Sequence, residues 1–384
     1  MPRQSPDPSL KYRITLATIL LLTLHSITTT NNSLFVRRRS LRSLPDIREA
    51  RYLHETDSTL PPWAHFNLKS VHSRPDETET PIFWHIPKCG GTTAKRFYGD
   101  CLHLTLANRL GASPKFGHDQ DTSLIAFEPF AGSSQKLVNV DTTTESGILR
   151  AAQLGLAESN LADMIFTSDI NFASKHLFTR LNKGRVFAFF RHPIDRLVSK
   201  FYYLQTATWE NTYRPEWKEL SLLEWATDHN VDENHMVKKI LGKKLNDKVD
   251  ISDLILAKEI VRHKFFVGKM DEMEESIVRF NIVLGVNNDS TEVRQCMKEY
   301  FGDEGEKVEV AVTDVEEEGE GDRAKADDKK NSHAHPKVQE GSPEWELLAE
   351  RNSLDMILYN YVQLLFNQQK NIIEGFREWK TAVE

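Results

Sequence analysis

Two short segments of this chain carry residue types that suit the binding of phosphate or sulfate groups. The first, residues 85–93 (HIPKCGGTT), joins an apolar run typical of a strand to a segment with helical spacing. Because the first N–H groups of a helix have no acceptor within it, such a loop directs them at an anion. Its two glycines permit close approach, its two threonines add hydroxyl donors and its lysine adds a positive charge. The residues predicted to contact the anion are Lys88, Cys89, Gly90, Gly91, Thr92 and Thr93.

The second segment, residues 187–203 (FAFFRHPIDRLVSKFYY), begins as a buried strand that ends at Arg191. Pro193 suits the first position of a helix, and Ser199 then lies about two turns into that helix. Because arginine binds phosphate through two parallel hydrogen bonds, Arg191 and Ser199 are predicted to hold one phosphate if the intervening loop folds back. Taken singly, each segment also has a plainer interpretation. The first would be a simple strand-to-helix turn, and the arginine of the second would make a structural salt bridge.

The elements that would position these residues alternate along the chain. Strand-like apolar runs cover residues 81–86, 137–140, 164–167, 186–190 and 265–267. Helical spacing covers residues 92–110, 145–156, 173–181 and 194–206, and residues 221–285 are mostly helical. Strands that alternate with helices predict an α/β fold with a central parallel sheet flanked by helices.

Composition limits the classes of protein to which this chain can belong. It has 384 residues, of which 39% are hydrophobic and 27% charged, so it can build a core and is not wholly disordered. The formal net charge of −7 argues against nucleic-acid binding through bulk charge. Three cysteines allow one disulfide with one thiol left over and exclude a zinc site built from several cysteines. No metal site is expected.

The charge and hydropathy pattern divides the chain into segments. Residues 1–13 are a short tail, and the uncharged residues 14–34 predict a signal anchor in a membrane, with a cleaved signal peptide or a transit peptide as alternatives. Residues 35–78 are expected to be a stem or linker, and residues 79–384 the folded domain. Within that domain, residues 303–340 are predicted to be a disordered acidic insertion, because residues 303–330 hold twelve acidic and five basic side chains.

Together the two anion-binding segments resemble the sulfotransferase family, and in particular the Golgi-type carbohydrate sulfotransferases. The P-K-x-G-G-T-T loop is similar to the family's 5′-phosphosulfate loop. The F-x-x-x-R-H-P-x-x-R-x-x-S-x-x-Y run is similar to its 3′-phosphate motif. Residues 233–238, 266–273 and 352–366 resemble further segments of the family. Residues 138–144 and 207–213 resemble those of some algal and diatom members.

The resemblance implies a P-loop-like three-layer sandwich that binds 3′-phosphoadenosine 5′-phosphosulfate (PAPS) as co-substrate. Lys88 would contact the bridging oxygen and the sulfuryl group, and Arg191 and Ser199 would hold the 3′-phosphate. The sulfuryl group would pass to a hydroxyl or amine, with a glycan as the expected acceptor, and no metal is needed. The expected location is the Golgi membrane, with one membrane span and a lumenal catalytic domain, or secretion after signal cleavage.

One departure from the family concerns the catalytic base. Many members carry a Gly-His pair on the central strand, where the histidine takes the acceptor's proton. The best match here is residues 166–169 (FTSD), which offers Asp169 instead. A carboxylate can take this proton if its pKa is tuned. His118 and Asp141 are the other candidates.

Two further functional classes stay open at this stage. A P-loop-like kinase or nucleoside triphosphatase should carry its lysine after the glycines, whereas Lys88 precedes them. A non-catalytic binding protein that keeps the sulfotransferase fold is the other alternative, because the expected histidine is missing.

Overall fold

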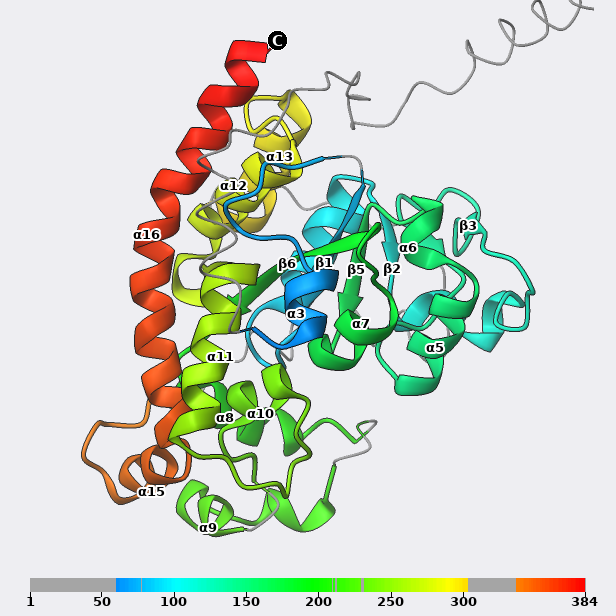
Figure 1. The fold of residues 1–384 in the computed structure, drawn as a ribbon. Helices are drawn as coiled ribbons and strands as arrows, with labels where there is room; N and C mark the ends of the chain where they lie inside the picture. Colours follow the sequence, from blue (N-terminus) through cyan, green and yellow to red (C-terminus); the bar gives the residue numbers. More distant parts are fainter. Residues whose placement is uncertain are drawn as a thin grey trace, which may run out of the picture. The chain divides into compact units, whose positions relative to one another are not determined.

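The computed structural model describes residues 60–76, 78–208, 210, 213–228, 231–302 and 336–383. These residues form an α/β fold around one seven-stranded sheet (Figure 1). The strands are β1 (Glu79–Trp84), β2 (Thr105–Ala107), β3 (Ala126–Phe127), β4 (Lys136–Val138), β5 (Met164–Thr167), β6 (Lys183–Phe190) and β7 (Phe265–Lys269). Their order across the sheet is β3-β4-β2-β5-β1-β6-β7, and all neighbours are parallel except β3 and β4. The expected α/β class with a central, mostly parallel sheet is confirmed.

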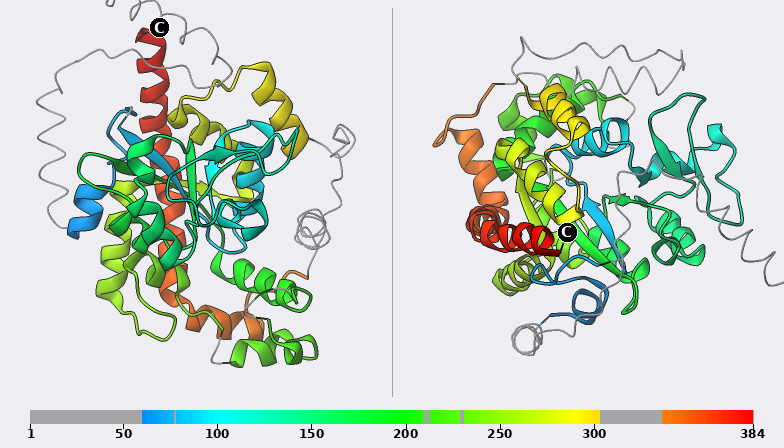
Figure 2. Two further views of the ribbon diagram at one scale, coloured as in Figure 1. Left: turned by 90° about the vertical axis from the view of Figure 1, so that its right-hand side faces the viewer. Right: turned by 90° about the horizontal axis from the view of Figure 1, so that it is seen from above.

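Helices flank the sheet (Figure 2). They are α3 (Pro62–Asn67), α4 (Gly91–Arg96), α5 (Glu145–Gln153), α6 (Leu156–Ser159), α7 (Ile170–His176), α8 (Pro193–Leu204), α9 (Leu222–Thr227), α10 (His235–Leu241), α11 (Ile251–Lys264), α12 (Met273–Leu284), α13 (Thr291–Phe301), α15 (Pro343–Arg351) and α16 (Ser353–Val383). Short 3₁₀ or π-helical turns are η1 (Phe97–Cys101), η2 (Arg109–Ala112), η3 (Pro114–Phe116), η4 (Pro215–Lys218) and η5 (Met270–Glu272).

The centre of the sheet is the core of the fold. In β6, every residue from Gly184 to Phe190 is buried, as expected for a parallel strand covered on both faces. Aromatic rings continue this core between layers. Phe83 of β1 stacks on Phe166 of β5 at 5.0 Å, and Phe189 of β6 stacks on Phe280 of α12 at 5.4 Å. Aromatic side chains on adjacent strands therefore fix the positions at which β1, β5 and β6 end.

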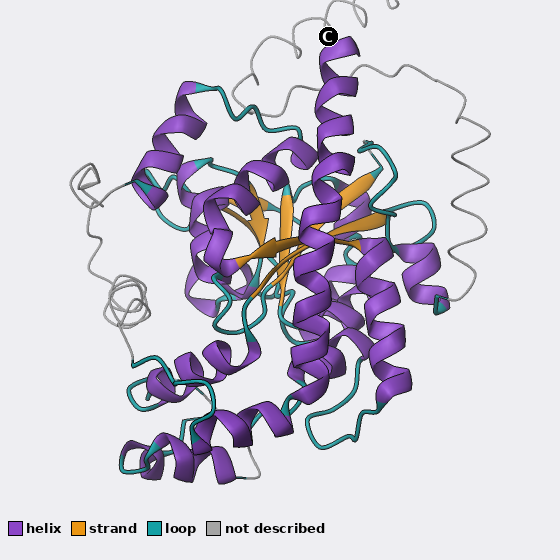
Figure 3. Ribbon diagram, turned by 90° about the vertical axis from the view of Figure 1, so that its left-hand side faces the viewer, coloured by secondary structure: helices purple, strands orange, loops and turns teal. Residues whose placement is uncertain are grey.

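The long helix α16 covers the β7 edge of the sheet (Figure 3). Gln369 of this helix is buried; its Nε2 donates to the Phe265 carbonyl at 2.7 Å, and its Oε1 accepts from the Val267 N–H at 3.0 Å. These bonds satisfy backbone groups of an edge strand that would otherwise face outward. No helix among the described residues has the length and hydrophobicity to cross a membrane.

Residues 60–76 correct the prediction of a stem or linker over residues 35–78. Leu60, Ala64, Leu68 and Val71 are buried, and α3 packs against α7 and β6. The backbone is also tied down, because the Lys69 N–H donates to the Gly184 carbonyl at 2.9 Å. Composition misled here because a few well-spaced apolar residues suffice to dock a short segment onto a sheet that already exists. Residues 35–59 and the predicted anchor at 14–34 lie outside the described residues.

The helix expected over residues 92–110 is shorter than predicted. It runs through α4 and the π-helical turn η1 to Cys101, and the chain then enters β2 at Thr105. The apolar residues of this stretch repeat at helical spacing, but two of them, Leu106 and Ala107, belong to an inner strand and are buried there. Most of the predicted acidic insertion, residues 303–335, lies outside the described residues, whereas residues 336–340 are described and lead into α15.

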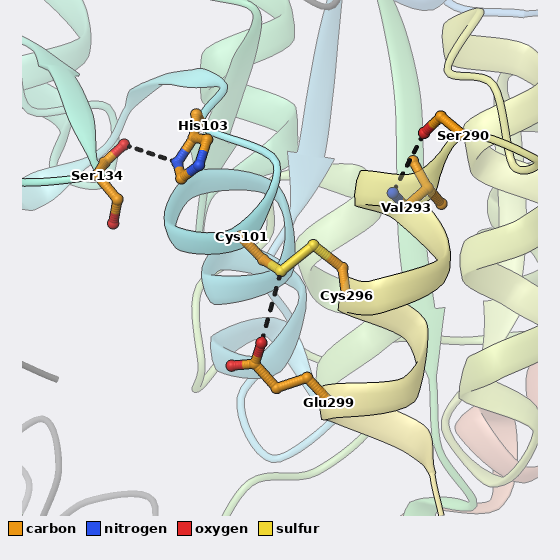
Figure 4. Close-up of a disulfide and its surroundings, with 7 residues drawn as sticks. All are labelled: Cys101, His103, Ser134, Ser290, Val293, Cys296 and Glu299. Atoms are coloured by element: carbon orange, nitrogen blue, oxygen red, sulfur yellow. Dashed lines mark hydrogen bonds between the residues drawn. A yellow bond between two sulfur atoms is a disulfide. The ribbon is translucent and has the colours of Figure 1, made fainter. Parts of the chain in front are cut away.

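A disulfide joins the end of η1 to α13. Cys101 and Cys296 are bonded across 195 residues of sequence, with their Cα atoms 5.9 Å apart (Figure 4). Cys89 is a free, buried cysteine. The bond ties the helix that follows the first anion-binding segment to the last element before residues 303–335.

We predict that reduction destabilises the fold. A cross-link that closes a loop this long lowers the entropy of the unfolded chain and contributes about 2–5 kcal/mol. Dithiothreitol should therefore lower the melting temperature of the wild type, as followed by circular dichroism. The Cys101→Ala/Cys296→Ala double variant is the control, since dithiothreitol should leave its lower melting temperature unchanged. Three titratable thiols in the unreduced, denatured wild type would contradict the disulfide.

Candidate functional site

The two predicted anion-binding segments meet at the carboxyl edge of the sheet. The first follows β1 and the second follows β6, and these two strands are parallel neighbours. Their register pairs Trp84 with Ala188, so both strands leave the sheet at nearly the same level. In open α/β sheets, ligands bind in the crevice outside such strand ends. The strand order alone therefore brings the two segments into reach of one ligand.

The loop after β1 has a left-handed backbone at two positions. Lys88 has φ 65° and Gly90 has φ 82°. A left-handed conformation costs a non-glycine residue roughly 1–2 kcal/mol, so Lys88 is held in this form by its surroundings. Left-handed residues within a turn gather successive backbone N–H groups into a concave, anion-binding nest. The first turn of α4, with Thr92 and Thr93, follows directly after Gly90.

Arg191 connects the two segments. Its Nη1 donates a hydrogen bond of 3.1 Å to the carbonyl oxygen of Lys88, 103 residues earlier in the sequence. The Lys88 Nζ lies 4.1 Å from the centre of the Tyr203 ring in α8, which is a cation–π contact. The backbone of Lys88 is thus held by the end of β6, and its side chain is held by α8.

Ser199 lies on the face of α8 that turns toward this loop. Ser199 and Tyr203 are four residues apart in one helix, a spacing that places two side chains one above the other. Because Tyr203 contacts Lys88, the same face carries the buried Ser199 toward the loop. The structure therefore brings Lys88 and Arg191 into direct contact, and it places Ser199 one turn before Tyr203 in α8.

The surroundings of Arg191 suit an anionic ligand. Among the described residues, its guanidinium forms no ion pair with a carboxylate, and its one hydrogen bond goes to the neutral carbonyl of Lys88. Burial lowers its pKa, but arginine keeps its proton in proteins because the ordinary value is far above neutrality. A half-buried guanidinium with donors to spare gains most from a phosphate, which can accept two of them at once. This is the feature of the site that best suits an anionic group.

Cys89 can contribute only its backbone to a ligand. Its side chain is buried, and its thiol accepts a hydrogen bond from the Arg191 N–H. Burial raises the pKa of the Cys89 thiol to about 11, although Arg196 and Arg191 oppose this shift. The sulfur is therefore protonated at neutral pH and fills space beneath the loop, so it is not a nucleophile.

A buried charge cluster lies behind the site. Asp232 Oδ2 accepts hydrogen bonds from Arg196 Nη1 at 3.3 Å and from Lys200 Nζ at 2.8 Å, and His235 Nδ1 lies 3.5 Å from the same oxygen. Burial raises the pKa of Asp232, but His235, Lys200 and Arg196 outweigh it and hold that pKa well below its usual range. One carboxylate thus pairs with two cationic side chains of α8.

Two helices near this cluster cap each other. The Asn234 side chain, just before α10, accepts from the N–H groups of Leu354 and Asp355 in the first turn of α16. In return, the Asp355 carboxylate accepts from the N–H groups of Met236 and Val237 in α10, each at 2.9 Å. Each helix satisfies the other's unpaired N–H groups, which is a reciprocal form of N-capping. Burial raises the pKa of Asp355 to about 6 despite these two hydrogen bonds.

Asp169 is close to the loop in the fold, but its carboxylate already has partners. It follows β5, the strand on the other side of β1, at the same edge of the sheet. Its Oδ1 accepts from the Phe172 N–H at 3.1 Å and caps α7, and its Oδ2 pairs with Lys239 Nζ at 3.2 Å. These are the contacts of a structural cap. The structure leaves Asp169 near the loop, and it assigns no base role to it.

His118 and Asp141 lie further from the loop or are engaged in turns. The His118 ring packs on Phe127 of β3 at 4.7 Å, and its Nδ1 lies 3.0 Å from Asp121 Oδ2. Four strand spacings, roughly 19 Å, separate β3 from β1. Asp141 accepts hydrogen bonds of 2.7 Å from Thr143 and Thr144 and so closes the turn before α5. Of the three candidate bases, Asp169 is the one that follows β5, a direct neighbour of β1 in the sheet.

His85 is a residue to which sequence reasoning gave no role of its own. It ends β1, and its N–H donates to the Thr167 carbonyl of β5 at 2.8 Å. A Cβ atom on Gly91 would lie 2.1 Å from His85 Cδ2, so the ring rests directly on the start of α4. Burial lowers the pKa of His85 to about 4, and the charges of Lys95 and Lys88 add to this effect. The sequence feature that could have identified it is a histidine directly after a buried strand, two residues before Pro87.

Comparisons with known proteins do not extend this description. No family model matches the chain, and no curated protein matches it. The functional argument therefore depends on the residues and their geometry.

We predict that His235 makes the protein acid-sensitive. Burial, with Arg196, lowers the pKa of His235 to about 3, while Asp232 opposes the shift. The unfolded chain takes up this proton near pH 6.5, so stability is complete above that pH and falls as the pH drops from about 6.5 toward 3. The expected slope from this group is about 1.4 kcal/mol per pH unit.

Urea unfolding of the wild type and of His235→Gln at pH 7.0, 6.0 and 5.0 measures this slope. The variant should lose less stability than the wild type between pH 6.0 and 5.0. Asp355 titrates with the opposite sign near pH 6, and it is present in both proteins, so the difference between them isolates the histidine. Equal slopes for the two proteins would show that His235 accepts its proton normally.

Proposed function

We propose that this chain is a PAPS-dependent sulfotransferase with a P-loop-like sulfotransferase fold. The observation that carries the proposal is the hydrogen bond from Arg191 to the Lys88 carbonyl. It joins two motifs that resemble the two phosphate-binding motifs of one family, although they lie 103 residues apart. The strand order brings the two motifs to one edge of the sheet, and this bond joins the arginine of one motif to the backbone of the other.

The residues divide the work of holding the donor. The loop amides from Gly90 to Thr93 and the charge of Lys88 would hold the phosphosulfate end and stabilise charge that builds up as the sulfuryl group leaves. Arg191 and Ser199 would hold the 3′-phosphate, so that binding energy remote from sulfur orients the donor. PAPS supplies a sulfuryl group that is already attached to a good leaving group. Lys88 reaches the loop from its amino-terminal side, where a kinase loop has no lysine.

The acceptor and the location follow from the resemblance and from one structural feature. A hydroxyl or amine acceptor, most simply on a glycan, fits a lumenal enzyme anchored through residues 14–34. The Cys101–Cys296 disulfide supports this location, because such bonds form and persist in oxidising compartments. The membrane segment itself lies outside the described residues.

A non-catalytic binding protein with the same fold is the second candidate. The observation in its favour is that both carboxylate oxygens of Asp169 are engaged, one in capping α7 and one in the pair with Lys239. If Asp169 were the base, it would first have to leave these partners. This candidate predicts nucleotide binding without transfer.

We predict that 3′-phosphoadenosine 5′-phosphate (PAP) raises the melting temperature of the full chain. A ligand that binds only the folded state stabilises it by about 2.7 kcal/mol at a hundred times its Kd. Arg191→Ala should abolish the shift, because it removes the charged donors for the 3′-phosphate. ATP with Mg²⁺ should give little or no shift, since ATP lacks that phosphate.

Arg377→Ala is the matched control for this prediction. Arg377 is an exposed arginine of α16 that pairs with Glu374 in the same helix, so its loss should leave the PAP shift unchanged. A well-folded wild type that PAP does not stabilise would refute the donor assignment. Stabilisation by ATP with Mg²⁺ in preference to PAP would favour the kinase class.

A further inference from the structure

We infer that His85 is the catalytic base of this site and takes the acceptor's proton during sulfuryl transfer. The inference rests on the proposed function and names a residue that neither of its two motifs requires. It comes from the position of the ring beside the anion loop and from its lack of a structural partner.

The ring of His85 lies where the acceptor would meet the donor. His85 leaves β1 two residues before Pro87 and Lys88, and its ring lies against Gly91 at the start of α4. The backbone bond to Thr167 places it next to the end of β5, on the side of the loop opposite to Arg191 and α8. Arg191 and α8, which would hold the 3′-phosphate, therefore lie on one side of the loop, and His85 lies on the other. The acceptor would then approach from the β5 side.

The ring nitrogens of His85 are not used by the fold. Among the described residues, they form no hydrogen bond, whereas the ring nitrogen of His118 contacts Asp121 and that of His235 contacts Asp232. The ring is half-buried and is not sealed inside the core. A histidine held by packing, with its nitrogens unpaired, is arranged to exchange a proton with a ligand.

The charges around the ring keep it neutral before the donor binds. Lys88 of the loop and Lys95 of α4 are the cations that act on it, and both favour the uncharged imidazole. Beyond them, at the end of β5, Asp169 is paired with Lys239. A bound donor would bring negative charge between Lys88 and the ring, and so would offset the two lysines. The base would then become stronger only when the donor is in place.

The proposed step balances in atoms and charge. The acceptor oxygen forms its bond to sulfur, and the bond from sulfur to the bridging phosphate oxygen breaks. The hydroxyl proton passes to a ring nitrogen of His85, which becomes an imidazolium. The bridging oxygen leaves with its electron pair on PAP, and Lys88 stabilises that charge. Release of the proton to water restores the neutral ring.

The first test measures the pKa of His85 directly. In the full chain with ¹³C-labelled histidines, nuclear magnetic resonance follows each ring through a pH titration, and His85→Gln identifies the signal of His85. We expect PAP to raise the pKa of His85 by at least one unit. His176, an exposed histidine of α7 packed on Phe172, serves as the control and should not shift. A pKa of His85 that PAP does not change overturns the proposal.

The second test separates binding from transfer. His85→Gln should keep the PAP-induced rise in melting temperature and should consume PAPS about 10²–10⁴ times more slowly, whether water or desulfated heparin is the acceptor. His176→Gln should match the wild type in both measurements. Asp169→Asn tests the rival base, and its loss of turnover in a protein that keeps both PAP binding and the His85 shift would move the role to Asp169.

The outcomes distinguish this inference from the proposed function. If the wild type neither binds PAP nor consumes PAPS, the proposed function fails and the role of His85 fails with it. If the wild type does both and His85→Gln turns over within threefold of it, only the role of His85 is refuted. In a wild type that binds PAP without consuming PAPS, the titration decides, because a proton-accepting role requires the shift in pKa.

Discussion

The contact between the Arg191 guanidinium and the Lys88 carbonyl depends on a constraint set far from it, the adjacency of β1 and β6. Parallel neighbours in register deliver their carboxyl ends to one place, so the loop after each strand can reach the other. Aromatic rings pack between these strands within the core, with Phe83 of β1 stacked on Phe166 of β5 and edge-to-face with Phe189 of β6. The rest of the site follows from this. The Lys88 backbone is held in a left-handed form, its side chain is steered onto Tyr203, and α8 turns its Ser199 face to the same loop.

The site gathers several cationic side chains, and few carboxylates pair with them. Among the described residues, the Arg191 guanidinium forms no ion pair with a carboxylate, and behind it Asp232 contacts both Arg196 and Lys200. Such an arrangement costs stability in the absence of an anion, because buried cations lose their hydration. Behind the loop, the reciprocal caps of α10 and α16 stabilise the fold that carries this cost. The folded protein loses some stability in this way, and the same buried cations would favour the binding of an anionic ligand.

The class of fold and the two anion-binding segments could be predicted from the sequence, because their signals are local. Contacts that depend on distant segments of the chain could not be predicted. Runs of apolar residues located β1, β5, β6 and β7, because these signals are local. Residues 60–76 looked like a linker because nothing local shows that the sheet will bind them. The sequence also could not show which of the candidate residues is the catalytic base. Asp169 and His118 differ from His85 in which neighbours occupy their polar atoms, and a sequence does not show which neighbours a side chain will have.

The reciprocal caps of α10 and α16 constrain the order in which the protein can fold during its synthesis. The Asn234 side chain can accept its hydrogen bonds only after residues 354 and 355 have been synthesised. The N–H groups of Met236 and Val237 likewise have no acceptor until Asp355 is present. A ribosome adds roughly 5–20 residues each second, so the middle of the chain emerges well before its partner does. During that interval the start of α10 exposes unsatisfied backbone groups beside a half-built sheet. The caps of α10 can therefore form only after residues 354 and 355 have been synthesised, and the core of the domain is completed late in synthesis.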